Sequence, residues 1–368
     1  MKTKVAIVFA QPSPYRIDLV ECLQNEYPEY EFCFFYGESL GTRNWEINLS
    51  GIKHHRKVNL KWIKVKAFGD IRSIIYSSTV MQPLNDYYPD AIIASEYNAI
   101  ALDALKWAKR HKKPFITWTD GTLYSERNIN FAQKLQRMHV IRNAAAYIAS
   151  SKKSKEVQLR YGAEEEKIWI STLTVDTKKY LIEKRKTDVP TIIFVGSLIE
   201  RKGFDLLLKA LSQIGNMPYK LIVAGDGVEK EHYIDLANSY GILNRIDFRG
   251  FVRAEEMRDL YARSDIFVLP TREDCFGLVL IEAMCASLPI FVSKYADGAY
   301  EVVEDGVNGY IFDPNDVECF ANLLKKGITD QDMREKMGME SRKRVEELTL
   351  SKVAVPIIKA IQTVLKGV

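Results

Sequence analysis

The stretch from Ile266 to Met284 combines a hydrophobic run, an acidic loop and a glycine in an order that suits phosphate chemistry. The run Ile266–Leu269 is typical of a buried strand, and Gly277 lies where a helix is expected to begin. The start of a helix presents unpaired N–H groups and a partial positive charge, which stabilise a phosphate. Glycine also lets the backbone approach a ligand closely. The stretch therefore predicts a phosphate site near Gly277.

Two carboxylates flank this glycine. Glu282 is expected about one turn into the helix, where it could accept hydrogen bonds from both hydroxyls of a ribose, as an acidic residue does in dinucleotide sites. Asp274 lies eight residues earlier, in the loop before the phosphate site, where we expect the transferred sugar to bind. Either carboxylate alone could be a solvated surface group. The ordered set of strand, acidic loop, glycine and glutamate favours a nucleotide-sugar site.

A second candidate loop, from Val195 to Leu211, carries two adjacent cations, Arg201 and Lys202, between a predicted strand and a predicted helix. Arginine offers a planar fork of donors, and lysine offers a compact charge. Together they could hold a diphosphate and stabilise it as it leaves. The alternative is an ordinary basic loop. The sequence AGDG at residues 224–227 is a weaker signal, as consistent with a turn as with a ligand contact.

Short hydrophobic runs alternate with helical patterns along the chain, which predicts parallel sheets covered by helices on both faces. In the first half the expected strands are Val5–Ala10, Glu31–Tyr36, Ala91–Glu96, Phe115–Thr119 and Ala145–Ser150, with helices such as Ile17–Glu26 and Ile100–Lys109 between them. The pattern restarts after Pro190, with expected strands at Thr191–Val195, Lys220–Ala224, Ile246–Arg249, Ile266–Leu269 and Ile290–Ser293.

We therefore expect an α/β protein of two Rossmann-like, doubly wound parallel-sheet domains that face a central cleft. The expected domains are residues 1–185 and 186–350, joined by the charged segment Lys178–Asp188 as a linker or a solvated helix. Residues 351–368 carry a helical hydrophobic stripe with Pro356 as a kink. We expect this helix to cross back to the first domain.

The bulk composition is that of a soluble globular protein, and no uninterrupted hydrophobic run approaches the roughly 20 residues of a membrane span. The N-terminal hydrophobic stretch reads as a first strand, not as a signal peptide. The five cysteines are widely spaced, which fits a reducing cytoplasm and argues against structural zinc. Residues 1–190 carry 30 Lys and Arg against 21 Asp and Glu, and the remainder carries 22 against 27. Nucleic acid, an anionic membrane surface or plain solvation could explain the basic half.

The second half resembles the donor domain of retaining glycosyltransferases with the GT-B fold, above all glycosyltransferase family 4 (glycosyl transferases group 1). Five motifs carry the resemblance over more than 100 residues, in the order of the family. They are a loop ending in Lys-Gly, a G-x-G turn, an F-x-G-x-V strand end, a carboxylate-x7-Glu loop and helix, and a late G-x-x-E…DG-x-NG stretch, here at Gly196–Gly203, Gly225–Gly227, Phe248–Val252, Asp274–Glu282 and Gly298–Gly309. The first half matches only in its βα pattern.

The resemblance implies a role for each matching position. Arg201 and Lys202 correspond to the pair that binds the donor phosphates, Glu282 to the ribose ligand and Asp274 to the acidic residue that faces the donor sugar. Backbone contacts are implied at Gly277, Leu278 and Val279 around the diphosphate or sugar, and at Phe251 and Val252 around the base.

Several positions depart from the family pattern. Asp274 stands where the family usually has Glu, which shortens its reach, and Ser197 replaces an Arg, which leaves Arg201 as its substitute. The first loop reads QPSPYRIDL and resembles a subgroup with Ser-Pro-Tyr-Arg, whose Arg16 would face the cleft or be an exposed first-turn residue. Asp120 stands near the place of a usual His and, with Glu96 at another strand end, is a candidate for acceptor binding.

In this family the leaving phosphate itself is thought to take the acceptor proton on the front face of the sugar, so that no protein base is needed. Arg201, Lys202 and the helix start would supply charge stabilisation. None of the candidate loops carries an Asp-x-Asp metal motif, so we expect a metal-independent hexosyltransferase with the nucleotide-sugar as substrate and no cofactor. By resemblance a UDP-sugar is the expected donor, and a glycan or lipid-linked acceptor in cell-surface polysaccharide synthesis is expected, with no nucleic acid.

Three other functions remain alternatives. An NAD-dependent oxidoreductase would need a G-x-G-x-x-G loop after the first strand, but the first loop has no glycine. A GT-B nucleotide-sugar epimerase or phosphorylase shares the fold but lacks this motif set. A non-catalytic nucleotide-sugar-binding protein stays open because of Asp274.

The stretch from Lys53 to Lys66, KHHRKVNLKWIKVK, holds six Lys and Arg, hydrophobic residues such as Trp62 and no acidic residue. A second basic run spans Lys106–Lys113. Such patterns favour an anionic membrane surface, so the protein is expected in the cytoplasm with peripheral binding to the inner face of the membrane. The alternative is a strand at Lys61–Phe68 with solvated basic neighbours.

Overall fold

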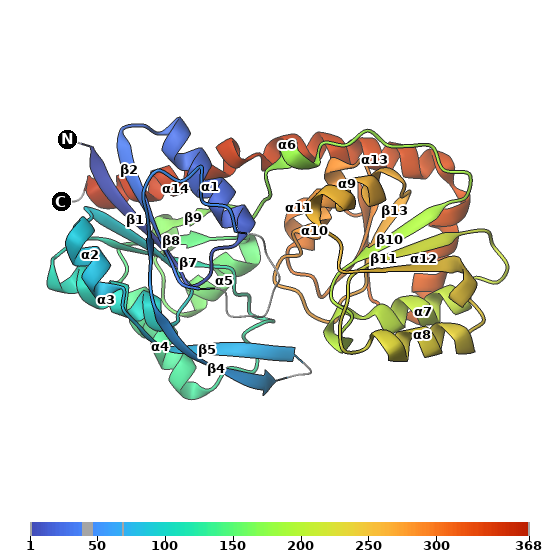
Figure 1. Ribbon diagram of the computed structural model, residues 1–368, viewed down its shortest axis with the longest axis horizontal. Helices are drawn as coiled ribbons and strands as arrows, with labels where there is room; N and C mark the ends of the chain where they lie inside the picture. The colour runs from blue at the N-terminus through green and yellow to red at the C-terminus, as the bar shows by residue number, and fades with distance from the viewer. Residues whose placement is uncertain (1, 39–46, 68–69, 367–368) are drawn as a thin grey trace. The chain divides into compact units, whose positions relative to one another are not determined.

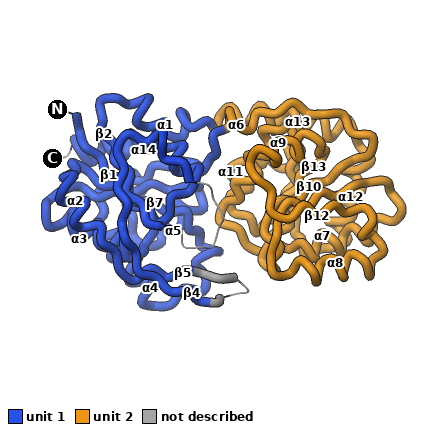
Figure 2. Tube along the Cα trace, viewed as in Figure 1, with its two compact units in different colours: residues 1–67, 71–176, 349–368 blue, residues 68–70, 177–348 orange. Residues whose placement is uncertain are grey.

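The computed structural model describes residues 2–38, 47–67 and 70–366, apart from the side chains of residues 66, 67 and 70–72. The chain forms two compact units (Figures 1 and 2): unit 1 comprises residues 1–67, 71–176 and 349–368, and unit 2 comprises residues 68–70 and 177–348. The expected boundary at residues 185/186 lies nine residues further along. The segment between belongs to unit 2 because Lys184 pairs with Asp265 at 3.0 Å and Arg185 with Asp259 at 2.6 Å.

Unit 1 contains a parallel sheet in the order β3-β2-β1-β6-β7-β8-β9. Its strands are β1 (Thr3–Phe9), β2 (Tyr30–Tyr36), β3 (His55–Lys57), β6 (Ala91–Ser95), β7 (Phe115–Thr119), β8 (Ala146–Ala149) and β9 (Ile168–Ile170). Successive residues of a strand point to opposite faces, so Ala6 and Val8 enter one hydrophobic core while Val5 and Ile7 enter another. Two covered faces explain why these strands are hydrophobic throughout.

Helices cover both faces of this sheet (Figure 1). One core contains residues of α2 (Met81–Tyr87), α3 (Ala99–Arg110), α4 (Phe131–Asn143) and α5 (Lys152–Arg160), and the other contains residues of α1 (Pro14–Glu26) and α14 (Leu350–Leu365). The strands β4 (Leu60–Ala67) and β5 (Asp70–Ser78) form a separate two-stranded sheet.

Unit 2 contains a second parallel sheet in the order β12-β11-β10-β13-β14-β15. Its strands are β10 (Thr191–Val195), β11 (Lys220–Ala224), β12 (Ile246–Gly250), β13 (Ile266–Leu269), β14 (Ile290–Ser293) and β15 (Gly309–Phe312). Its helices are α6 (Thr177–Tyr180), α7 (Phe204–Ser212), α8 (Lys230–Ser239), α9 (Ala254–Ala262), α10 (Val279–Cys285), α11 (Ala299–Val302), α12 (Val317–Thr329) and α13 (Gln331–Val345). Both sheets are parallel with the strand order of a doubly wound fold, which confirms the predicted α/β class with two Rossmann-like domains.

The strand order reverses at one place in each sheet, between β10 and β13 in unit 2 and between β1 and β6 in unit 1. In open α/β sheets, ligands bind beyond the carboxyl ends of the strands at such a switch point. The loops that follow these four strands are therefore where a site is expected in each unit.

The C-terminal helix α14 returns to unit 1, where it packs on α1 and on β8 and β9 (Figure 2). It runs through Pro356 without ending. Within the described chain, Gln331–Leu365 is long and hydrophobic enough to cross a membrane by length and composition. A helix packed in a protein core passes the same test, and α14 buries Ile357 and Ile361 completely.

The expected strands Phe115–Thr119, Thr191–Val195, Lys220–Ala224, Ile266–Leu269 and Ile290–Ser293 are observed with those bounds, and the others differ at their ends by one or two residues. The sequence analysis did not predict β3, β5, β9 or β15. The expected strand Lys61–Phe68 corresponds to β4; Phe68 and the side chain of Lys66 lie outside the described part of the chain.

Candidate functional site

The two predicted loops of unit 2 meet at its switch point. Arg201 and Lys202 form a short 3₁₀ turn after β10, and Asp274 lies in the loop after β13. The ammonium of Lys202 donates to Oδ2 of Asp274, and both side chains are about 15% exposed. Nη1 of Arg201 donates to the carbonyl oxygen of Glu273 at 2.9 Å. The structure thus brings together two cations and one carboxylate that lie 72 residues apart in sequence.

Backbone contacts fix these loops against each other. The hydroxyl of Thr271 and the N–H of Arg272 both donate to the carbonyl oxygen of Arg201, at 2.9 and 2.8 Å. The guanidinium of Arg272 forms a two-pronged ion pair with Asp205, at 2.7 and 2.6 Å. Gly203 has φ +68°, and a Cβ there would lie 2.1 Å from the carbonyl oxygen of Pro270. Only glycine permits this close approach, which explains why a glycine follows Lys202 in the motif.

The ion pair controls the charge of Asp274. Burial alone would raise the pKa of its carboxyl, but the charge and hydrogen bond of Lys202, with the charge of Arg201, lower that pKa below its usual value. Asp274 is therefore ionised at neutral pH. Its backbone also bridges two loops, because its N–H donates to Tyr295 and its carbonyl accepts from Asp297, at 3.0 and 2.9 Å.

The predicted phosphate site lies at the start of α10. Gly277 has φ +79°, in the left-handed region that favours glycine, and the neighbouring Gly298 has no room for a Cβ, which would lie 2.3 Å from the carbonyl oxygen of Phe276. Leu278 and Val279 follow Gly277 directly and open α10. The first N–H groups of a helix have no helical carbonyl to bond, so they are available to an anion.

Glu282 lies in the first turns of α10 and is held by tyrosines. The hydroxyl of Tyr261 in α9 donates to its Oε2 at 2.9 Å, and Tyr180 of α6 also donates to it. Burial raises the pKa of the Glu282 carboxyl to about 7, an effect that these hydrogen bonds only partly offset. Tyr261 is itself completely buried. The carboxylate is therefore oriented and stands near the midpoint of its titration at neutral pH.

Phe251 and Val252 follow β12 at the same carboxyl edge of the sheet, and the side chain of Phe251 is 60% exposed. Their backbone placement fits the predicted base contact. The glycines of the AGDG sequence have a packing role, because a Cβ at Gly225 or Gly227 would lie about 2 Å from the carbonyl oxygens of Gly196 and Leu198. This close approach explains the weaker motif without a ligand.

Unit 1 has a charged cluster at its own switch point. Arg16, at the start of α1, is only 2% exposed, and its guanidinium stacks over the rings of Trp118 and Phe9 at 4.1 and 4.7 Å. Its Nη2 donates two hydrogen bonds to Asp120, at 2.6 and 2.9 Å, and Ser150 donates a further one to the same carboxylate. Burial disfavours the charge of Arg16, but Asp120 outweighs that effect and raises its pKa.

One donor of this cluster is left over. Among the described residues, Nη1 of Arg16 has no hydrogen-bond partner although it is buried. Buried polar groups are normally hydrogen-bonded, so this unpaired donor is unusual. Nη1 has almost no exposed surface, and the 26% exposed carboxylate of Asp120 is the group beside it that a ligand hydroxyl can reach.

Glu96 completes this cluster from the end of β6. Its backbone has φ +65°, which is uncommon for a residue with a side chain. The carboxylate accepts a hydrogen bond from the N–H of Asp120 at 2.9 Å and one from the hydroxyl of Thr119 at 3.4 Å. Burial, with the nearby charge of Asp120, raises the pKa of Glu96 to about 7. The three predicted residues Arg16, Glu96 and Asp120 are thus brought together.

Several supporting residues were not predicted. Tyr261 and Tyr180 orient Glu282, and Ser150 and Trp118 hold Asp120 and Arg16. Tyr180 lies at the edge of a segment that the sequence analysis treated as a linker. Ser150 ends a predicted strand, as Glu96 does, and that position at the carboxyl end of a parallel strand was the available signal.

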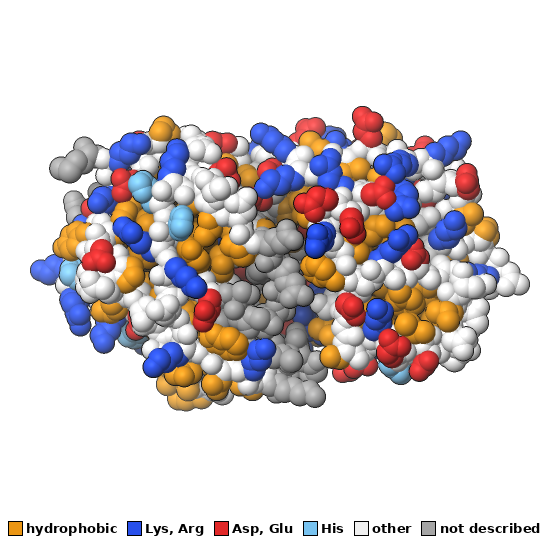
Figure 3. All heavy atoms as spheres, viewed as in Figure 1, with side chains coloured by type: hydrophobic (Ala, Val, Ile, Leu, Met, Phe, Trp, Pro, Cys, Tyr) orange, Lys and Arg blue, Asp and Glu red, His pale blue; other side chains and the backbone are white. Residues whose placement is uncertain are grey.

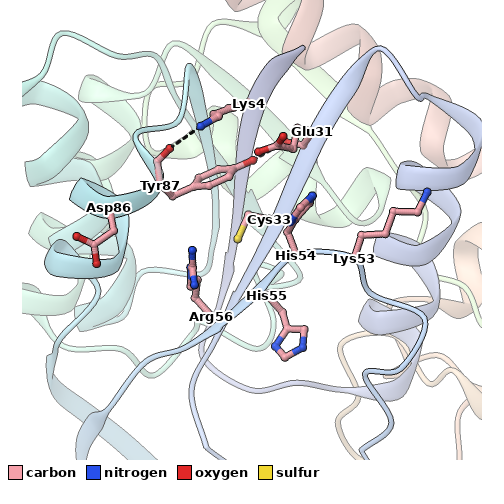
Figure 4. A pocket seen from close by; sticks show the side chains of 9 residues that line it. All are labelled: Lys4, Glu31, Cys33, Lys53, His54, His55, Arg56, Asp86 and Tyr87. Carbon is pink, nitrogen blue, oxygen red and sulfur yellow. Dashed lines mark hydrogen bonds between the residues drawn. The ribbon is translucent and has the colours of Figure 1, made fainter. Parts of the chain in front are cut away.

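Unit 1 also has a hollow of about 340 Å³ away from this cluster (Figure 4). It is lined by the first residues of β1 and β2, such as Lys4 and Cys33, and by Lys53–Arg56. These are the amino ends of the strands, so the hollow is not part of the candidate site. Burial raises the pKa of the Cys33 thiol to about 12, which excludes it as a nucleophile at neutral pH.

Comparison with known proteins bears on both units. Residues 177–344 match the family model of the glycosyl transferases group 1. A lipopolysaccharide core biosynthesis glycosyltransferase of Rhizobium meliloti is 28% identical over 173 residues, which is 46% of this chain and 49% of that protein. The chain spans about half the length of the curated relatives it matches.

Solved structures match over nearly the whole chain. The lipopolysaccharide outer core galactosyltransferase WaaB has a TM-score of 0.76 at 17% identity, with 98% of this chain and 99% of that chain covered. Anabaena HepE in complex with UDP and glucose has a TM-score of 0.74 at 18% identity, with 98% and 100% covered. At these identities the likeness establishes the fold, which is GT-B.

Proposed function

We propose that the chain is a retaining glycosyltransferase of the glycosyl transferases group 1, the family whose model residues 177–344 match, and that it uses a nucleotide-diphosphate sugar. The observation that carries the proposal is the meeting of Arg201, Lys202 and Asp274 at the switch point of unit 2, next to the start of α10. Cations and free N–H groups there suit a diphosphate, and the carboxylate suits a sugar hydroxyl.

In the donor site, Glu282 binds both ribose hydroxyls, and the backbone of Phe251 and Val252 frames the base. The N–H groups of Gly277, Leu278 and Val279 bind the diphosphate or the sugar. Tyr261 supports this assignment because it holds the carboxylate of Glu282 from the side at 2.9 Å. Asp274 then takes a hydroxyl of the donor sugar.

We propose a front-face transfer. The bond between the anomeric carbon and the phosphate oxygen breaks, the acceptor oxygen forms a bond to the same face of that carbon, and the leaving phosphate takes the acceptor proton. Negative charge grows on the phosphate as the bond breaks, so Arg201 and Lys202 stabilise the transition state more than the ground state. These cations replace a metal ion in the proposal, which also needs no cofactor.

The acceptor half of the proposal rests on Arg16, Glu96 and Asp120. The partly exposed carboxylate of Asp120, held in place by Arg16, offers an acceptor to a sugar hydroxyl. We propose a glycan or lipid-linked acceptor in cell-surface polysaccharide synthesis, as the name of the Rhizobium meliloti relative suggests for that protein. The five free cysteines support a reducing compartment, the cytoplasm.

UDP is the proposed nucleotide, since HepE was solved with UDP and glucose. A thermal-shift panel tests the donor: UDP-sugars, GDP-sugars, NAD and UDP alone are each added to the protein. A ligand at 100 times its Kd stabilises by roughly 2.7 kcal/mol. We expect at least one UDP-sugar to raise Tm in the wild-type protein and not in Glu282→Ala. The proposal would be rejected if only NAD raised Tm, or if none of the nucleotide-sugars did.

A further inference from the structure

The outer face of the β4–β5 sheet in unit 1 is hydrophobic. Ile63, Ile74 and Tyr76 are 53%, 47% and 59% exposed, while the intervening side chains of Trp62 and Ile75 pack against the core. Side chains alternate between the two faces of a strand, and a sheet with one solvated face normally carries polar residues there. One face of this sheet therefore packs against the core of unit 1, and the other face exposes large hydrophobic side chains that no described residue of unit 1 covers.

Helix α4 adds to this surface. Phe131 and Leu135 lie one turn apart and are 73% and 48% exposed, whereas Met138 of the same helix packs against the core that also receives Trp62 and Ile75. A capping box between Asn130 and Gln133 fixes the start of the helix, so Phe131 is held at the surface. Figure 1 draws α4 and the two strands at the same end of unit 1, and Figure 3 shows hydrophobic, Lys and Arg side chains gathered there.

Both elements are basic. Strand β4 contains three Lys and no acidic residue, and α4 contains three Lys and Arg and no acidic residue, of which Arg137 pairs with Glu126 at 2.7 Å. Lys61 is exposed on the same face of β4 as Ile63, and Lys134 is exposed on α4 between Phe131 and Leu135. Lys64 lies on the opposite face of β4, over the ring of Trp62. The basic residues of β3 have a different explanation, because β3 is the edge strand of the main sheet and charges there prevent pairing with another sheet.

We propose that this surface, formed by Ile63, Ile74, Tyr76, Phe131 and Leu135 with the lysines around them, docks on an anionic lipid surface. Lysines draw the protein to anionic headgroups, and large hydrophobic and aromatic side chains enter the boundary between headgroups and acyl chains. Charge complementarity selects a membrane over a neutral protein partner. The inference concerns a partner and needs no catalysis, so it stands or fails independently of the proposed reaction.

Sedimentation with vesicles tests the charged part of the surface. The full chain, without donor or acceptor, is mixed with vesicles of phosphatidylcholine and phosphatidylglycerol or of phosphatidylcholine alone. We expect the protein to pellet only with the anionic vesicles and to be released by salt. Lys61→Gln with Lys134→Gln is expected to weaken partitioning by roughly 30-fold, about fivefold for each charge. The matched pair in unit 2, Lys209→Gln with Lys220→Gln, should leave it unchanged.

The hydrophobic part separates a membrane from other polyanions. Ile63→Ser with Ile74→Ser, and separately Phe131→Ser, should lower partitioning at least tenfold, while Met339→Ser, an equally exposed position in unit 2, should not. Circular dichroism spectra and Tm values like those of the wild type, measured without ligand, confirm that each variant is folded. If the lysine variants lose binding but the serine variants keep it, the surface binds a polyanion by charge alone and the proposal is overturned. Equal binding to neutral vesicles, or none to anionic ones, overturns it as well.

Discussion

Lys202 and Asp274 form an ion pair between the loops that follow β10 and β13, across the switch point of the unit 2 sheet. In the proposed reaction the cation meets the donor phosphate and the carboxylate meets the donor sugar. The pair therefore holds both groups in place before the donor binds, at a site where each is only about 15% exposed. Removing one partner leaves the other buried and unpaired, so each variant needs a control that separates stability from chemistry.

Lys202→Met is expected to lower kcat by roughly 100-fold or more, while the KM for the donor changes only a few-fold. The side chain keeps its length but loses the charge that stabilises the departing phosphate. Steady-state kinetics at several donor concentrations measures both constants. A variant that loses donor affinity and keeps kcat would contradict the assigned role.

The control is Lys202→Met with Asp274→Asn. Lys202→Met alone should lower Tm, because it leaves the Asp274 carboxylate without its counter-ion. The double variant should recover much of that Tm, since the amide carries no charge, but none of the activity. Recovery of activity together with Tm would mean that Lys202 acts only on stability.

Donor affinity should depend on pH through Glu282. Its pKa is raised to about 7 in the free protein, and only the ionised carboxylate accepts hydrogen bonds from both ribose hydroxyls. Affinity should therefore be full above pH 7 and fall as pH drops, approaching tenfold per unit below the pKa. Calorimetry with a UDP-sugar, whose diphosphate does not titrate in this range, measures the profile. Glu282→Gln should bind more weakly, by about 1.5–3 kcal/mol, with no such profile.

Tyr261→Phe provides the matched variant for that profile. It removes the hydrogen bond that the hydroxyl donates to Oε2 of Glu282. Because that bond favours the ionised carboxylate, its loss should raise the pKa of Glu282 further and move the pH profile upward. An unmoved profile would show that another group titrates. The same raised pKa means that ionisation of Glu282 opposes folding, so stability should decrease as pH rises from about 4.5 to 7, and less so in Glu282→Gln.

Arg16→Ala should destabilise unit 1 by about 3 kcal/mol or more, because it leaves Asp120 without its ion pair and removes packing on Trp118 and Phe9. Arg16→Lys should recover only part of the loss, since an ammonium lacks the planar fork that stacks on Trp118. Urea unfolding followed by tryptophan fluorescence gives the free energies. Equal stability of Arg16→Ala and the wild type would show that the pair contributes nothing to the fold.

Transferase activity should survive EDTA. In the proposal, Arg201 and Lys202 stabilise the negative charge on the leaving phosphate, so no divalent ion is needed. Product formation is followed before and after chelation, and again after Mg²⁺ or Mn²⁺ is added. Activity that EDTA abolishes and either ion restores would replace this assignment with a metal-dependent one.

The sequence predicted the central strands well, because each combines a hydrophobic run with a polar or glycine-containing end. Thr191–Val195 and Ile266–Leu269 are examples, buried on both faces. The missed strands include β5 (Asp70–Ser78), which belongs to the separate two-stranded sheet, where it pairs with β4. The other three are edge strands of the main sheets. Ile168–Ile170 is only three residues long, Gly309–Phe312 starts with a glycine, and His55–Lys57 is exposed throughout, so none shows the hydrophobic run of a central strand.

The candidate site was predictable where its residues act through local sequence, and not where they act through distant contacts. Gly277 and Glu282 follow from the strand–loop–helix pattern. Tyr261 lies 21 residues before Glu282 on another helix, and no local sequence pattern predicts the hydrogen bond between them. Arg16 looked equally like an exposed first-turn cation, and only the tertiary fold places it between Trp118 and Asp120.

The measurement that tests the account most directly is the anomeric configuration of the transferred sugar in the product. The protein is incubated with the UDP-sugar that gives the largest thermal shift and with glycan and lipid-linked acceptors, and the product is followed by proton NMR from the first turnovers. The account predicts a new glycosidic bond with the same anomeric configuration as the donor, and loss of that signal in Lys202→Met. A product of opposite configuration, a free epimerised sugar, or donor binding without any transfer would contradict it.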